Sequence, residues 1–283
     1  MARAVSDRDR RRRARTNARA PHARARQRRL RLKLAILGSG TAIPHPRRGA
    51  SGYALIAPSG EVLLIECGPG STRRWPAFGI TFERVRAIVV THHHVDHCAD
   101  LAPVMFGRNV PDPPVRTPLA MIGPVGHHAL VDGLEGLYGS AVMDPFGMRE
   151  VIEMKDGDRR IVGPFTIDTR EVLHVAGSLG LRVTCGGRVL AFSGDTGKCP
   201  ELVALCRGAH VALLECSYPA ARATTKHLNT RTAAETAVDA QLSRVVLTHF
   251  YPQCDDVDVA GEVRTAGYTG ELVLAEDGLV LDV

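Results

Sequence analysis

The 283-residue sequence lacks any long hydrophobic run, and this absence excludes one class of protein. No stretch approaches the roughly 18 consecutive apolar residues of a membrane-spanning helix, so no membrane partner is expected. The seven cysteines are scattered, odd in number and without Cys-x-x-Cys spacing. This pattern argues against a disulfide framework and predicts reduced, buried thiols in a cytoplasmic protein. The 45% hydrophobic content suffices for one large core or two small ones.

Residues 1–31 also lack what a folded core needs, because alanine is nearly the only apolar residue among them. The first 33 residues hold 13 Arg and one Lys against two Asp, a net charge of 14 − 2 = +12. The other 250 residues hold 22 basic and 28 acidic side chains, so the overall charge of +6 describes neither part. The sequence predicts a disordered arginine-rich tail over 1–31 and one folded domain over 32–283.

The arginine-rich tail has several interpretations. Such an arm could bind RNA by neutralising phosphates and releasing counterions. A run of like charge is more often only a solvated tail, and a translated upstream GC-rich sequence or a mis-assigned start gives the same composition. The paired arginines lack a following hydrophobic region, so an export signal is not expected.

One loop concentrates residues that can bind a metal. Four of them fall within six positions, directly after a β-branched run at 86–90 that predicts a buried strand. They are His92, His94, Asp96 and His97. Imidazole nitrogens and a carboxylate suit Zn²⁺. A fortuitous histidine run is the alternative, but such runs usually lie in terminal or disordered segments, so the loop is predicted to bind metal.

This His-x-His-x-Asp-His pattern resembles the signature of the metallo-β-lactamase superfamily, and the resemblance covers roughly residues 32–283. The stretch from His174 to Arg182 resembles the His-x-x-x-Ser-x-Gly-x-Arg stretch of the ribonuclease Z-like branch. The resemblance implies an α/β protein of the metallo-β-lactamase fold. We therefore expect a four-layer αββα sandwich, in which two mixed β-sheets are flanked by helices.

Three further residues match ligand positions of the family, and each comes at the end of an apolar segment. They are His174, Asp195 and His249. The resemblance implies two zinc ions per chain, because an Asp such as Asp195 would bridge them and lower their mutual repulsion. Zinc is expected rather than iron, since flavodiiron relatives carry Glu where this chain has His94. The implied ligands are His92, His94 and His174 for one ion, and Asp96, His97 and His249 for the other.

The resemblance also implies a hydrolytic mechanism. The two ions would lower the pKa of a bridging water, so that hydroxide is the nucleophile, and Asp96 belongs to the catalytic set. His227, just before a predicted helix, resembles a histidine that assists catalysis in ribonuclease Z, with Glu215 orienting it. Glu66 occupies the position where the family usually has an Asp that orients the metal ligands. The side chain of Glu66 is one methylene longer than that of Asp.

The substrate is less closely defined by the sequence. The resemblance favours a phosphodiesterase, such as an endonuclease that cleaves transfer-RNA precursors at the 3′ side. However, the 76 residues between His97 and His174 contain no long Gly/Pro/Lys-rich arm, and the body is net acidic. A small diester, an ester, a lactone or an aryl sulfate are therefore alternatives on the same site. A homodimer is one assembly that the sequence permits.

A protein that only binds RNA, with purely structural zinc, is a further alternative. It is disfavoured because structural zinc sites are normally closed and rich in cysteine, and no predicted ligand here is Cys.

Three local features carry more specific structural expectations. Residues 150–171 alternate in short segments, which predicts a strand hairpin around Asp156-Gly157-Asp158. A helix is expected to begin at Cys98, directly after the histidine motif. His127 and His128 match no ligand spacing and are predicted to be packing or surface residues.

Overall fold

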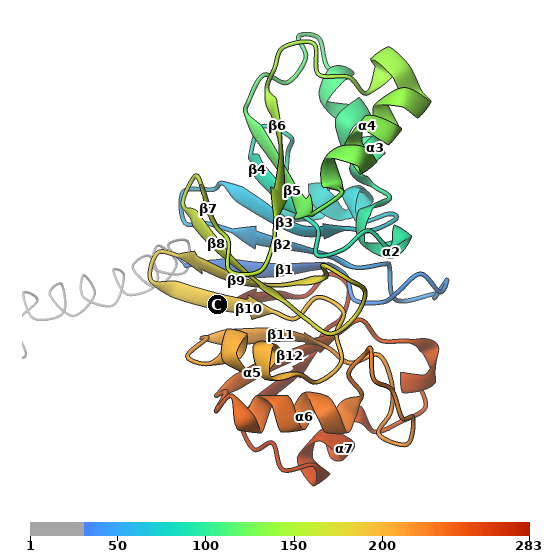
Figure 1. Cartoon of the computed structure of the whole chain (residues 1–283), viewed down its shortest axis with the longest axis vertical. Coiled ribbons are helices and arrows are strands. Elements are labelled where there is room, and N and C mark those ends of the chain that lie inside the picture. The colour runs from blue at the N-terminus through green and yellow to red at the C-terminus, as the bar shows by residue number, and fades with distance from the viewer. Residues whose placement is uncertain (1–30) are drawn as a thin grey trace, which may run out of the picture.

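The computed structural model describes residues 31–283, which form two seven-stranded sheets (Figure 1). In spatial order, the first sheet contains β14 (Val280–Asp282), β1 (Lys33–Gly38), β2 (Gly52–Ile56), β3 (Val62–Cys67), β4 (Val85–Val89), β5 (Leu119–Pro124) and β6 (Arg149–Met154). The second contains β13 (Glu271–Leu274), β12 (Arg244–Thr248), β11 (Val211–Glu215), β10 (Arg188–Phe192), β9 (Leu179–Cys185), β8 (Phe165–Glu171) and β7 (Arg159–Val162). Of the predicted tail over 1–31, only Arg31 lies within the described residues.

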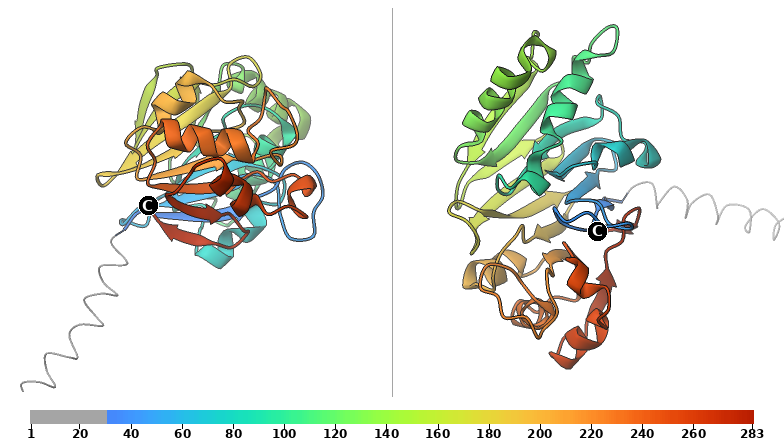
Figure 2. Two further views of the ribbon diagram at one scale, coloured as in Figure 1. Left: turned by 90° about the horizontal axis from the view of Figure 1, so that it is seen from below. Right: turned by 90° about the vertical axis from the view of Figure 1, so that its right-hand side faces the viewer.

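The helices cover the outer faces of the two sheets. On the side of the first sheet lie η1 (Thr72–Phe78), α2 (Val95–Cys98), α3 (Leu101–Asn109), α4 (His127–Tyr138) and η2 (Gly139–Ala141). On the side of the second lie α5 (Pro200–Cys206), α6 (Thr230–Asp239), η3 (Pro252–Cys254) and α7 (Val259–Thr265). Figure 2 shows from two further directions that α4 and α6 lie on opposite sides of the paired sheets. No helix within residues 31–283 is both long and apolar enough to cross a membrane.

Three apolar cores separate the four layers. The central one lies between the sheets, where side chains such as Ile36 and Tyr53 of the first face Phe165 and Phe192 of the second. The outer two lie beneath the helices of each side. Strands buried on both faces explain the continuous apolar runs in the sequence. The predicted four-layer αββα sandwich of two mixed sheets is confirmed.

The predicted hairpin around residues 156–158 is wrong. β6 pairs in parallel with β5 in the first sheet, whereas β7 pairs with β8 in the second. The turn at 156–158 therefore carries the chain from one sheet to the other, and the hairpin is the β7–β8 pair. Alternation marks a strand with two different faces, but it does not identify the strand's partner.

The helix after the histidine motif begins earlier than the sequence suggests. Its first turn is α2, which starts at Val95, and a new helix, α3, starts at Leu101. Asp96 and His97 thus lie on a helical turn rather than in an extended loop. The turn holds both side chains on one short, rigid segment.

The strand directions bring the carboxyl ends of several strands to one edge. β3 and β4 run parallel, as do β10, β11 and β12. β8 and β10 are both antiparallel to β9, so they also share a direction. Loops at the carboxyl ends of parallel strands are where α/β proteins usually place functional side chains.

Candidate metal centre

All nine predicted site residues lie at this edge of the two sheets. The first sheet supplies four of them from the segment after β4, which are His92, His94, Asp96 and His97. In the second sheet, Glu215 ends β11 and His249 directly follows β12. His174 and Asp195 come a few residues after β8 and β10, and His227 precedes α6. Fold topology thus gathers residues that are up to 157 positions apart, from 92 to 249.

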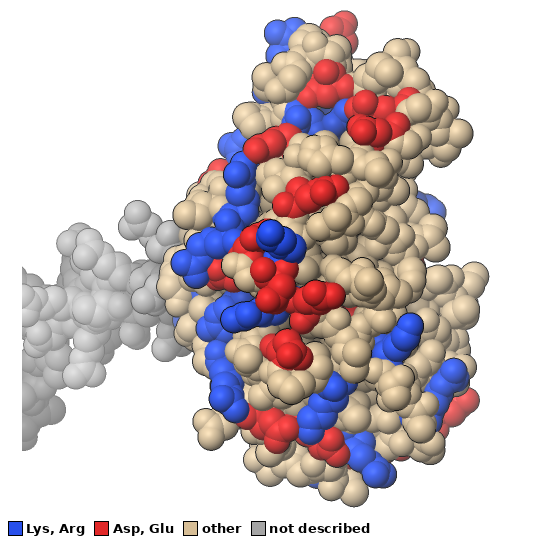
Figure 3. All heavy atoms as spheres, in the orientation of Figure 1, with Lys and Arg blue, Asp and Glu red and all other residues tan. Residues whose placement is uncertain are grey.

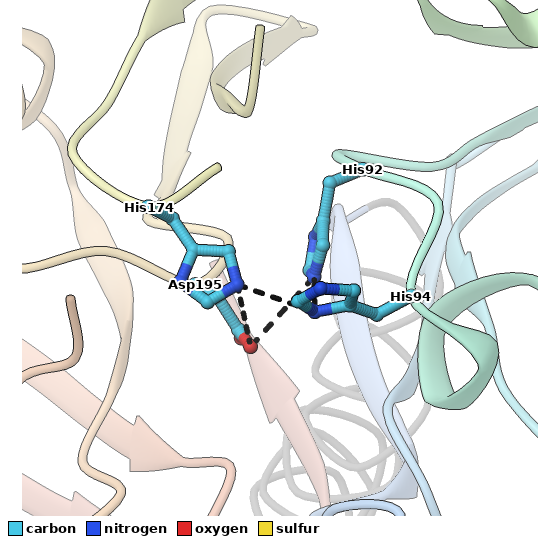
Figure 4. A group of neighbouring side chains, drawn as sticks. All are labelled: His92, His94, His174 and Asp195. Carbon is cyan, nitrogen blue, oxygen red and sulfur yellow. Dashed lines mark hydrogen bonds and ion pairs between the residues drawn. The ribbon is translucent and has the colours of Figure 1, made fainter. Parts of the chain in front are cut away.

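One group consists of His92, His94, His174 and Asp195 (Figure 4). The Nδ1 atom of His94 lies 3.0 Å from Nε2 of His92 and 3.3 Å from Nε2 of His174. Oδ2 of Asp195 lies 3.8 Å from Nε2 of His92 and 4.0 Å from Nε2 of His174. Their potential ligand atoms all fall within 4.8 Å of one another, and His94 is exposed, so the group is open to solvent.

A second group consists of Asp96, His97 and His249. Oδ2 of Asp96 lies 3.7 Å from Nε2 of His97 and 3.6 Å from Nε2 of His249. The same two nitrogens lie 3.4 Å from the oxygens of Asp195. Asp195 therefore stands between the two groups and reaches both.

The second group leaves polar atoms that a cation would satisfy. Among the described side chains, Nε2 of His97 and of His249 are buried without a well-aligned hydrogen bond. Leaving a buried polar atom unpaired costs roughly 1–3 kcal/mol. Burial alone would lower the pKa of His97, but Asp195 and Glu66 raise it well above its usual value. The carboxylates thus favour positive charge at this point, and a metal ion fits the residues present.

Neighbouring groups fix the orientation of the imidazole rings. Nδ1 of His174 donates to the carbonyl of Lys226 at 2.9 Å, which turns Nε2 towards Asp195. Nδ1 of His92 lies 3.1 Å from the Thr91 hydroxyl. Such contacts, made by the ring nitrogen that does not bind the metal, set the tautomer and position of metal-binding imidazoles. Burial lowers the pKa of His92 to about 2, so this ring is neutral and its lone pair is available to a metal.

His97 and His249 are oriented by different groups. Oε1 of Glu66 lies 3.3 Å from Nδ1 of His97, and it also accepts a hydrogen bond from the Thr91 hydroxyl. The Ser217 hydroxyl lies 3.1 Å from Nδ1 of His249. Glu66 and His249 both have left-handed backbones, with φ of 60° and 59°. Strain of this kind in non-glycine residues is typical of functional sites.

Glu215 and His227 form a pair beside the two groups. Nδ1 of His227 lies 3.1 Å from Oε1 of Glu215, and the Ser217 hydroxyl donates to the other oxygen at 2.6 Å. Burial would lower the pKa of His227, but the hydrogen bond to Glu215 raises it above its usual value. His227 is therefore protonated at a higher pH than an ordinary histidine.

Sequence reasoning missed Thr91, Ser217 and the amide of Ala42, which donates to Oδ2 of Asp96 at 3.0 Å. Thr91 and Ser217 each follow an apolar strand and lie within two residues of a predicted site residue. This position is the sequence signal by which they could have been found. An amide leaves no such signal. His127 is buried and stacks on His93, and His128 is exposed, so the prediction that neither is a ligand agrees with their positions.

Known proteins resemble this chain in sequence and in fold. The family model described as "Beta-lactamase superfamily domain" matches residues 62–250. An uncharacterised protein of Mycobacterium leprae is 31% identical over 88% of this chain and 87% of its own length. The ribonuclease Z of Mycobacterium marinum is 31% identical over 77% of this chain and 85% of its own length. The metallo-β-lactamase fold protein YhfI from Bacillus subtilis, at 22% identity, has a TM-score of 0.76 over 89% of this chain and 99% of its own, a likeness of fold.

Proposed function

The chain belongs to the β-lactamase superfamily and is a metal-dependent hydrolase, and on that premise we propose that it is a dinuclear zinc phosphodiesterase. The observation that carries the proposal is the position of Asp195. Its two carboxylate oxygens lie within 4.0 Å of four imidazole Nε2 atoms, which come from both groups. One carboxylate shared between two dications about 3.5–4 Å apart lowers their repulsion.

The seven predicted ligands divide between the two ions as the two groups do. One zinc ion would be held by His92, His94 and His174, the other by Asp96, His97 and His249, with Asp195 shared. When bound, the ions would supply Lewis acidity and a water of lowered pKa. A donor set of nitrogen and oxygen without cysteine suits catalytic zinc, which keeps a coordination position open.

His227 would donate a proton to the leaving oxygen. Its Nδ1 is already held by Glu215, which leaves Nε2 as the nitrogen that can face a substrate. The same contact makes Nδ1 a poor metal ligand, although it lies 3.9 Å from Asp195. The raised pKa of His227 favours the protonated imidazole, the form that a proton donor needs. Glu215 then acts by orienting the ring and stabilising its charge.

The charge of the proposed centre favours an anionic substrate. Asp96, Asp195 and the neighbouring Glu66 contribute one negative charge each, and two divalent ions more than offset them. His92 adds no charge, because burial holds it neutral. The net positive centre suits the negative charge of a phosphodiester. The likeness to a protein named ribonuclease Z supports the same class.

The body of the molecule favours a short substrate over a folded RNA. The residues between His97 and His174 are taken up by α3, β5, α4 and β6–β8, which all belong to the sandwich. On the face drawn in Figure 3, basic and acidic side chains alternate. Arg159 pairs with Asp168, and Arg160 with Glu150, so the positive charge of these two arginines is already neutralised.

Turnover of bis(p-nitrophenyl) phosphate tests this proposal. We expect hydrolysis that a chelator abolishes and added zinc restores, with p-nitrophenyl acetate and p-nitrophenyl sulfate cleaved more slowly. His92→Ala should abolish turnover, whereas His128→Ala, which changes an exposed histidine outside the centre, should not. Faster cleavage of the acetate or the sulfate would replace the phosphodiester with that class. A zinc-loaded protein that cleaves none of the three would contradict the proposal.

A further inference from the structure

Two tyrosines stack beside the candidate centre. Tyr218 follows β11 and Tyr251 follows β12, and their ring centroids are 4.9 Å apart with planes inclined by 28°. Because β11 and β12 are parallel neighbours, both residues leave the second sheet at the edge that carries the centre. The amide of Tyr251 donates to the carbonyl of Ser217 at 3.3 Å, which ties the two loops together. The pair is thus held in place by the sheet.

The tyrosine pair lies next to the proposed catalytic groups. The ring of Tyr251 lies 5.8 Å from that of His249 and 6.2 Å from that of His227. The ring of Tyr218 lies 5.9 Å from that of His227, at nearly a right angle. Tyr218 is buried, with 8% of its surface exposed, whereas Tyr251 remains partly exposed. Tyr218 therefore supports Tyr251, whose accessible surface borders the centre.

Arg222 adds a positive charge to this aromatic stack. Its guanidinium carbon lies 3.9 Å from the ring centroid of Tyr218, a cation–π contact. Within residues 31–283, no carboxylate lies close enough to Arg222 to form an ion pair, and the side chain is exposed. A guanidinium held flat on a ring, with its hydrogen-bond donors free, is suited to a phosphate.

Other exposed apolar side chains also flank the predicted ligands. Val95 separates His94 from Asp96 in the sequence and is 63% exposed. Leu173, directly before His174, is 50% exposed. Both residues are sequence neighbours of predicted ligands, so exposed apolar side chains occur on the segments that carry the charged centre. Such a site fits a substrate that combines a charged group with a flat apolar one.

We propose that Tyr251, supported from behind by Tyr218, forms a nucleobase subsite, so that the preferred substrate is a nucleotide diester with its base beside the scissile phosphate. The inference rests on the proposed phosphodiesterase function. Any nucleobase can stack on an aromatic side chain, so a tyrosine ring suits a subsite that does not distinguish one base from another. Arg222, on the same stack, would bind a phosphate that flanks the base.

Two substrates with the same leaving group test the subsite. Thymidine 5′-(p-nitrophenyl phosphate) carries a base, methyl p-nitrophenyl phosphate does not, and both release p-nitrophenolate. The wild-type protein should prefer the thymidine substrate in kcat/KM. Tyr251→Leu should lower this preference roughly 5- to 150-fold, the range for one stacked base. Tyr251→Phe, which keeps the ring, should retain most of it.

Tyr138→Leu provides the matched control, because Tyr138 is 53% exposed at the far end of α4. It should change neither rate. An unaltered preference in Tyr251→Leu would overturn the subsite, as would an equal loss on both substrates, which would indicate support of His249 instead. In either case turnover by the wild type would leave the phosphodiesterase proposal standing. If neither substrate is cleaved by the zinc-loaded wild type, the proposed function itself has failed.

A second measurement needs no variant of Tyr251. Thymidine should inhibit hydrolysis of bis(p-nitrophenyl) phosphate competitively, and thymidine 3′,5′-bisphosphate should inhibit more strongly. Arg222→Gln should weaken inhibition by the bisphosphate more than inhibition by thymidine. A wild-type protein that thymidine does not inhibit would overturn the base subsite, and equal weakening by Arg222→Gln would remove the flanking phosphate from it.

Discussion

The two sheets supply the candidate centre in different ways. The first sheet contributes four predicted ligands from one segment after β4, between His92 and His97. The second contributes three, each from a different strand end, at His174, Asp195 and His249. A local segment fixes the spacing of its ligands by backbone geometry alone. The second half depends on strand order, so its ligands come together only when the whole sheet is formed.

The largest expected effect comes from the residue at which the two halves meet. Asp195→Ala removes the carboxylate that lies within 4.0 Å of histidines from both sheets. The protein should then lose one of its two zinc equivalents by elemental analysis. Turnover of bis(p-nitrophenyl) phosphate should fall at least about 10³-fold, because several kcal/mol of charge stabilisation is removed.

Asp168→Ala serves as the control, since Asp168 lies on β8 of the same sheet and, within residues 31–283, forms its ion pair with Arg159. It should keep both zinc ions and its activity. Full activity of wild-type protein with one zinc equivalent would show that the halves do not share a dinuclear centre.

His227 provides the next largest effect, and it concerns the second sheet alone. His227→Ala should keep both zinc ions but lower kcat on a diester with a poor leaving group by roughly 10²–10⁴-fold. With p-nitrophenolate, which leaves without a proton, the loss should be much smaller. Glu215→Gln should give a weaker form of the same pattern, because Glu215 only orients the ring.

Two results would redraw this assignment. An equal loss on both leaving groups would mean that His227 stabilises charge on the phosphoryl oxygens instead of donating a proton. Loss of zinc would make His227 a ligand, and the two halves would then contribute four ligands each.

The same contrast explains what the sequence could predict. The family resemblance carried by the His92–His97 motif implied the layered fold, and the family order of motifs pointed to His174, Asp195 and His249. The partner of β6 could not be predicted, because alternation describes the faces of a strand and not its neighbour. The Ala42 amide and the Tyr218–Tyr251 pair were also missed, since such contacts exist only after distant loops meet.

A smaller effect is expected for the residues that orient the histidine ligands of the two sheets. Glu66 orients His97 in the first sheet, and Ser217 orients His249 in the second. Glu66→Gln and Ser217→Ala should each weaken zinc binding, by roughly 10- to 100-fold for a lost outer contact. Glu66→Gln should have the larger effect, because it also removes a negative charge beside the cation.

Competition with a zinc-binding dye measures both variants, and Ser59→Ala, a change in the exposed β2–β3 turn, is the control. Equal effects would mean that charge adds nothing to orientation. A larger effect of Ser217→Ala would make the second half the more sensitive one.

The smallest effect on the centre should come from the arginine-rich tail, which precedes β1 and so belongs to the first half of the chain. Deleting residues 1–31 should leave kcat on bis(p-nitrophenyl) phosphate unchanged, because none of the predicted site residues is removed. If the tail recruits RNA, the deletion should raise KM for a long RNA severalfold and flatten the salt dependence of RNA binding, since fewer phosphates are neutralised. A tail of equal length with Gln in place of Arg should behave like the deletion, which separates charge from length. Identical RNA binding by all three proteins would show that the tail plays no part, and the two sheets would then account for binding as well as catalysis.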